Sequence, residues 1–185
     1  MKKAAAITLF VLMAVLAYAQ TAPVTFTKVD KTYTFKNVSK KTITMVVVDQ
    51  AWAHGQVTSG AVEFLFKPRG FAPGDTYDQN SDAPSATLTF VQFSDGTTWG
   101  TSSGASAQEA LAKRKAMLAF LPNLANAGSE SEFLAALNQP QTDENAKLYQ
   151  TMYQMDVQSS GASVAWNAAK LRWSVAQSRS NVWEF

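Results

Sequence analysis

The 185-residue chain contains no cysteine and only one histidine, His54. The absence of cysteine excludes disulfides, thiolate metal sites, cysteine nucleophiles and a lipid anchor on cysteine. A single histidine excludes a multi-histidine metal site, and any catalytic triad would have to use it. We expect His54 to be a structural or surface residue, because no set of partner groups for catalysis stands out in the sequence.

The chain also lacks a charge excess beyond its first residues. Sixteen basic and 14 acidic side chains give a formal charge of +2, and Lys2 and Lys3 account for the difference. A balanced chain has no electrostatic footprint for nucleic acid or an anionic membrane, so we expect neither as a partner. Glycine-rich phosphate loops, a Gly-x-Ser-x-Gly elbow and a distinctive pair of carboxylates are missing too.

The N-terminus has the three parts of a secretory signal peptide. A lysine-containing start is followed by an apolar run from Ala4 to Leu16 and by the small-residue site Ala17-Tyr18-Ala19. The apolar run is shorter than the roughly 20 residues that a membrane-spanning helix needs. We therefore predict that residues 1–19 are removed, that the protein is periplasmic or extracellular, and that the mature chain has no integral membrane segment.

Short runs with strand patterns fill the first half of the remaining chain. Alternating or β-branched residues are separated by turn signals such as Pro73-Gly74 and Asp95-Gly96, and no long amphipathic helix intervenes. This spacing indicates an antiparallel sandwich over residues 20–100. The expected strands lie around residues 24–28, 32–36, 42–48, 63–66 and 86–93.

Three segments of this half resemble parts of a known type of domain. Asn37-Val38-Ser39-Lys40-Lys41-Thr42-Ile43 and Phe71-Ala72-Pro73-Gly74-Asp75 are similar to the strand corner and the pre-strand turn of immunoglobulin-like domains of exported bacterial proteins. Phe93-Ser94-Asp95-Gly96-Thr97-Thr98-Trp99 resembles their final hairpin. The resemblance covers residues 23–100 and implies an immunoglobulin-like β-sandwich, a fold that hosts many functions.

The second half of the chain has helical patterns. A Thr/Ser/Gly linker is predicted at residues 101–105, a helical region at 106–179 and a tail at 180–185. Ser106-Ala107-Gln108-Glu109 and Ser129-Glu130-Ser131-Glu132 are typical of capping boxes at helix starts. Together with the sandwich, about four helices make an α+β fold.

Two further helices are predicted after these. One begins near Thr142-Asp143 and breaks around Ser159-Ser160-Gly161, and the last runs from about residue 163 to 177. In the first of them Leu148, Met152 and Met155 have the spacing of one stripe. Because the helices are rich in alanine, we expect them to pack on each other and on the sandwich.

Aromatic residues are the main candidates for a binding site. The sequence holds five tryptophans, and an exposed tryptophan can stack on a sugar or anchor a protein partner. Trp166 and Trp173 are seven positions apart, which places both on one helix face. The simpler interpretation is that this face is the core side of the last helix. Tyr149 and Tyr153, one helical turn apart, can likewise belong either to a binding surface or to the core side of their helix. The candidates are Trp52, Trp99, Trp166, Trp173, Tyr149 and Tyr153.

One loop has a partial calcium pattern. Asp78, Asn80 and Asp82 occupy the first, third and fifth places of a calcium loop, whose oxygen ligands converge on the ion. Ala83 replaces the glycine of that pattern and Thr89 replaces its closing glutamate. A polar turn before a strand explains the same residues, so calcium is one alternative and no bound cofactor is the other.

Three functions remain open at this point. The first is a non-enzymatic protein that binds an envelope or extracellular protein, which fits a fold that often serves binding. The second is a glycan or small-ligand binding protein that uses tryptophan and tyrosine in a groove where the helices meet the sandwich. A hydrolase that uses His54, or an acid with a metal ion, is the weaker third, and we expect no enzyme.

Overall fold

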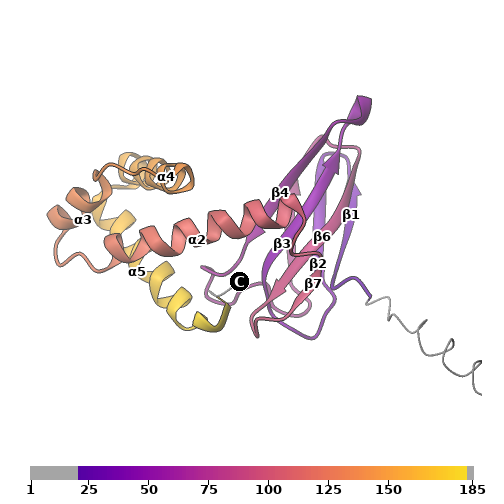
Figure 1. Cartoon of the computed structure of the whole chain (residues 1–185), viewed down its shortest axis with the longest axis horizontal. Coiled ribbons are helices and arrows are strands. Elements are labelled where there is room, and N and C mark those ends of the chain that lie inside the picture. The colour runs from indigo at the N-terminus through magenta and orange to yellow at the C-terminus, as the bar shows by residue number, and fades with distance from the viewer. Residues whose placement is uncertain (1–20, 183–185) are drawn as a thin grey trace, which may run out of the picture.

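The computed structural model describes residues 21–182 and has an α+β fold (Figure 1). Within these residues, seven strands form two antiparallel sheets and four α-helices follow them in the chain. The predicted fold class, an N-terminal β-sandwich followed by helices, is thus confirmed. The predicted signal peptide at residues 1–19 and the last three residues of the predicted tail lie outside the described residues.

The seven strands form one three-stranded and one four-stranded sheet. The first sheet has the order β1-β2-β5 and the second β4-β3-β6-β7, and every pairing is antiparallel. Compared with the constant-type immunoglobulin order, the fourth strand pairs with the third strand in the second sheet and does not join the first sheet. The strands are β1 (Val24–Val29), β2 (Thr32–Asn37), β3 (Ile43–Ala51), β4 (Val57–Glu63), β5 (Thr76–Asn80), β6 (Ser85–Phe93) and β7 (Thr98–Gly100).

Two segments differ from the sequence prediction. The strand expected at residues 63–66 is wrong: β4 instead covers the preceding residues and ends at Glu63. The residues after Glu63 turn away, with the Leu65 N–H donating to the Glu63 carboxylate at 2.8 Å. Residues 76–80, interpreted as part of a loop, form β5. Their alternation of exposed and half-buried side chains, with Tyr77 and Gln79 turned inward, is the period of a strand.

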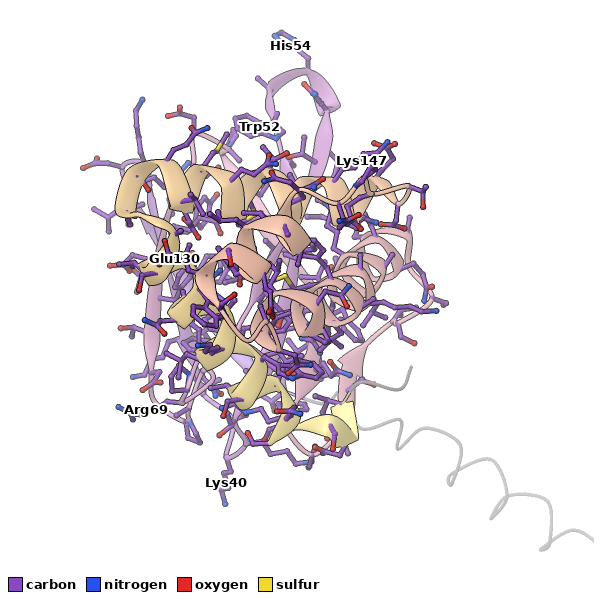
Figure 2. All side chains as sticks on the ribbon, turned by 90° about the vertical axis from the view of Figure 1, so that its left-hand side faces the viewer. Lys40, Trp52, His54, Arg69, Glu130 and Lys147 are labelled. Atoms are coloured by element: carbon purple, nitrogen blue, oxygen red, sulfur yellow. The ribbon has the colours of Figure 1, made fainter. Side chains whose placement is uncertain are left out.

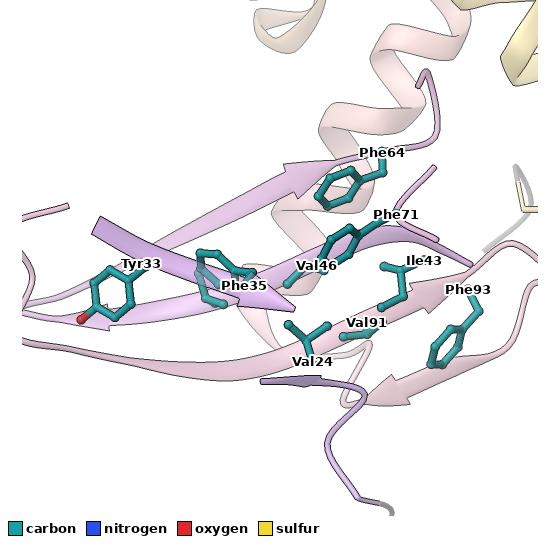
Figure 3. Close-up of a cluster of buried hydrophobic side chains, with 10 residues drawn as sticks. Val24, Tyr33, Phe35, Ile43, Val46, Phe64, Phe71, Val91 and Phe93 are labelled. Atoms are coloured by element: carbon teal, nitrogen blue, oxygen red, sulfur yellow. The ribbon is translucent and has the colours of Figure 1, made fainter. Parts of the chain in front are cut away.

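A core of large apolar side chains fills the space between the sheets. Rings from β2 meet β-branched residues of β3 and β6, and Phe64 stacks on Phe71 with ring centroids 4.7 Å apart (Figure 3). This burial is the main source of stability for the sandwich. The core comprises Val24, Tyr33, Phe35, Ile43, Val46, Val48, Phe64, Phe71, Val91 and Phe93.

The helices form a region beside the second sheet. The first half of α2 (Ala105–Ala125) covers the outer face of that sheet, where Ala107, Ala110 and Leu111 pack on Met45, Val47 and Phe90. Its second half projects beyond the sandwich, and the other helices gather around it (Figure 1). These are α3 (Glu130–Leu137), α4 (Glu144–Ser160) and α5 (Ala162–Gln177).

The helix starts agree with two of three sequence signals. Ser129 caps α3 by accepting from the Glu132 N–H, and Asp143 caps α4 by accepting from the Ala146 N–H at 2.9 Å. The predicted capping box at Ser106 is wrong, because α2 begins one residue earlier and the Ser106 hydroxyl is engaged elsewhere. No helix in residues 21–182 is long and apolar enough to cross a membrane.

Candidate functional site

A buried arginine joins α2 to the outer face of the second sheet. The Arg114 side chain is 0% exposed, and its Nε and Nη2 donate to the two carboxylate oxygens of Glu63 on β4 at 2.7 and 2.8 Å. Nη2 also donates to the Thr44 carbonyl at 2.9 Å, and Nη1 donates to the amide oxygen of Gln92. Because these partners come from three strands, the planar guanidinium fixes both the position and the rotation of the helix.

A second polar contact fixes the start of α2. One carboxylate oxygen of Asp49 on β3 accepts from the hydroxyls of Ser59 and Ser106 at 2.8 and 2.9 Å. The carboxylate therefore lies at the N-terminus of α2, where the helix dipole favours negative charge. Ser106 serves as a link to the sheet, which is why it does not cap the helix.

The end of α5 is tied back to the sandwich. Arg179 follows this helix, and Asn181 beyond it donates to the Ser94 carbonyl at 2.7 Å, while Val182 is fully buried. The Arg179 guanidinium donates to the carbonyls of Phe64, Leu65, Lys67 and Pro68. Both ends of the helical region are thus anchored, and the region is held at a fixed position on the sandwich.

The outward face of α4 is apolar and uncovered. Leu148, Met152 and Met155 are 49%, 46% and 60% exposed, whereas Ala146 and Tyr153 on the same helix are buried. At about 100° per residue, the two methionines lie within about 40° of Leu148 and Tyr153 lies about 140° away. The three residues do form one stripe of the helix, and the opposite stripe makes the packing contacts.

The outward side of α5 has the same character. Val164 and Leu171, seven residues apart, are 57% and 56% exposed. Of the eight large hydrophobic residues exposed among residues 21–182, five lie on α4 and α5, which make up only about a fifth of these residues. Scattered exposure of single apolar residues is ordinary, whereas this concentration on two adjacent helices is uneven.

The aromatic candidates do not share one groove. Trp52 lies beside the short 3₁₀ turn η1 (Ala53–Gly55), and its Nε1 donates to the Thr58 hydroxyl at 2.7 Å. Figure 2 shows Trp52 and His54 toward one end of the molecule and Lys40 at the other. Trp99 on β7 pairs with Val91 on β6, toward the Lys40 end. His54 is exposed at the tip of its turn.

The other four candidates belong to the helices. Trp166 stacks on Phe133 with ring centroids 6.5 Å apart, and Trp173 and Tyr149 pack at the edge of the same cluster. Tyr153 is buried within it. These four residues therefore stabilise the helical region and do not form an open aromatic groove between helices and sandwich.

The partial calcium pattern lies on an extended strand and its end. The hydroxyls of Thr34 and Thr32 on the neighbouring β2 donate to Asp78 and Asn80 at 2.6 and 3.0 Å, and Asp82 pairs with Lys31 at 2.9 Å. The side-chain oxygens thus turn to β2 and to Lys31 and do not converge on a point. No group of three His, Cys, Asp or Glu side chains with metal-site geometry occurs among the described residues.

Tyr149 gives a pH-dependent prediction. Burial, and then the negative charge of nearby Glu63, raise its pKa to about 12, and burial also raises the pKa of Tyr153. A phenol whose pKa is higher in the folded state stabilises the fold below pH 10, and this contribution is lost as the pH rises from about 10 to 12. We expect absorbance at 295 nm to show these tyrosines ionising only together with unfolding. Ionisation of every tyrosine near pH 10 with retained helicity would contradict this.

Comparison with protein-family models, with curated proteins and with solved structures finds no match.

Proposed function

We propose that the protein is an exported, non-enzymatic binding protein that docks an envelope or extracellular protein through the outward face of α4. The observation that carries this proposal is the uncovered stripe of Leu148, Met152 and Met155, opposite the packing face of the same helix. Methionine suits such a surface because its flexible, polarizable side chain adapts to a partner's shape. Burial of the stripe would remove apolar surface from water, which favours docking.

The surroundings of the stripe favour a protein partner. Charged side chains of Glu144, Lys147 and Asp156 flank it, which gives the apolar centre and polar rim typical of protein interfaces. We infer that the partner presents a complementary apolar face, such as the apolar side of an amphipathic helix. The anchored position of the helices supports this inference, since a preorganised surface loses less conformational entropy on binding.

A charge placed in the stripe tests the proposal. We expect Met152→Glu to lower the yield of a crosslinked pull-down from the protein's own envelope by at least about tenfold, because a buried, unpaired carboxylate opposes docking. The bound proteins are identified and quantified by mass spectrometry. Met152 is exposed in the free protein, so the variant is expected to keep the thermal stability of the wild type.

Val57→Glu is the matched control. Val57 is 58% exposed on β4, so the variant introduces the same charge at an exposed apolar position of the sandwich. We expect it to recover the same partner as the wild type at the same yield. Equal recovery by Met152→Glu and the wild type would show that α4 is not the docking surface.

A further inference from the structure

An open groove lies at the end of the sandwich opposite His54. It has a volume of about 480 Å³, and Trp99 and Phe93 supply aromatic surface to it. Polar groups come from Ser39, Lys40, Lys41, Thr97 and Thr98, and residues 21–23 and Val38 line the rest. A volume of this order is that of a small-molecule site.

The charged residues that line this groove, Lys40 and Lys41, are both basic. None of the described residues that line it is acidic. Lys41 is already paired with Asp95 at 2.7 Å, and hydrogen bonds from Lys41 and Thr97 lower the pKa of that carboxyl to about 2. Lys40 has no acidic partner among the described residues, so its ammonium group remains available to a ligand.

The polar groups beside the aromatic surface fit a hydroxylated ligand. Thr98 lines the groove immediately before Trp99. Ser39 and Thr97 line it too, but their hydroxyls already donate to Asn37 and Asp95 at 2.7 and 2.6 Å, so Thr98 is the residue that we assign to a ligand hydroxyl. The C–H face of a sugar ring is apolar and can lie on an indole, while its hydroxyls need hydrogen-bonding partners at the edge. A carboxylate on the same sugar would complement the unpaired ammonium group.

We propose that this groove binds an acidic saccharide, with a sugar ring on Trp99, ring hydroxyls toward Thr98 and a carboxylate at Lys40. The site is independent of the α4 face and of the protein partner proposed for it. A neutral saccharide lacks the group that pairs with Lys40, and a polyanion without sugar-like C–H faces lacks the contact with Trp99. The groove is therefore expected to select sugars that carry both a carboxylate and an apolar C–H face.

Calorimetric titration with tetragalacturonate tests this site, with neutral maltotetraose as the comparison ligand. We expect saturable binding of the acidic tetrasaccharide with a dissociation constant on the order of 1 mM, typical of a shallow open groove. Lys40→Glu and Trp99→Ala are each expected to weaken it by about tenfold. Raising sodium chloride from about 0.05 to 0.5 M should weaken it as well, because an exposed ion pair is screened.

Two control variants separate the groove from general effects. Lys36→Glu makes the same charge change on the outward face of β2, and Trp52→Phe removes an indole at the other end of the sandwich. Both are expected to bind within about twofold of the wild type. Met152→Glu should also bind normally, so failure of the α4 proposal would leave this result unchanged.

Three results would overturn the proposal. They are the absence of saturable binding of tetragalacturonate, equal affinity for maltotetraose, and equal weakening by Lys36→Glu and Lys40→Glu. Because Lys40 is exposed, Lys40→Glu keeps the test decisive even if Trp99→Ala lowers the stability of the sandwich.

Discussion

Replacing Arg114 by alanine is expected to lower the free energy of unfolding by about 3–5 kcal/mol, because it leaves a partly buried carboxylate without its counter-charge and a buried amide oxygen without its donor. The Glu63 carboxylate would lose its counter-charge and keep only the hydrogen bond from the Leu65 N–H, and the buried Gln92 amide oxygen would lose the donor Nη1. The Thr44 carbonyl would keep its hydrogen bond from the Phe64 N–H. Urea unfolding followed by far-ultraviolet circular dichroism measures the loss. The loss of stability in Arg114→Ala should be larger than that of any other polar substitution between α2 and the sheet.

Two variants separate this network from ordinary surface charge. Lys113→Ala removes the neighbouring exposed pair with Glu109 and is expected to cost less than about 0.5 kcal/mol. The double variant Arg114→Met, Glu63→Leu removes both charges together and should recover most of the lost stability, since apolar replacements of a buried pair are often neutral. A loss below about 1 kcal/mol in Arg114→Ala would show that the network does not hold α2 on the sheet.

Phe133→Ala is expected to destabilise the helical region by about 3–5 kcal/mol. Phe133 is fully buried in the helical core, where its ring stacks on Trp166, and its removal leaves a cavity between α3 and α5. Thermal unfolding followed by tryptophan fluorescence and by helicity measures the effect. Both signals should change at a lower temperature than in the wild type.

The matched comparison is Leu148→Ala, which truncates an apolar side chain of similar size on the outward face of α4. We expect its cost to stay below about 1 kcal/mol, because half of Leu148 is already in contact with water. A large loss in Leu148→Ala would mean that the stripe serves folding. The difference between the two variants therefore distinguishes the helical core from the proposed docking face.

Local patterns in the sequence predicted the architecture well. The sandwich and the order of helices follow from period-two runs, turn residues and the capping side chains of Ser129 and Asp143. Each of these signals is contained within a few neighbouring residues. The strand β5 was missed because its alternation is carried by polar residues, which are also the residues that form turns.

The contacts between helices and strands could not be predicted from such local patterns. Arg114 is a basic residue at the spacing of the apolar stripe of α2, between Leu111 and Met117, and this position was the one available sign of its burial. Nothing local identifies Glu63 as its partner, 51 residues away. Likewise, α4 has two apolar stripes, and periodicity alone does not tell which of them faces the core.

Methionine methyl resonances test the docking face most directly. Of the six methionines in the chain, four remain once the predicted signal peptide is removed. Met45 and Met117 are buried, in the α2–sheet contact and in the helical core, whereas Met152 and Met155 lie on the proposed surface. When the protein recovered by the pull-down is added, we predict that the methyl signals of Met152 and Met155 shift or broaden while those of Met45 and Met117 stay in place. Unchanged signals from the two exposed methionines would contradict the account.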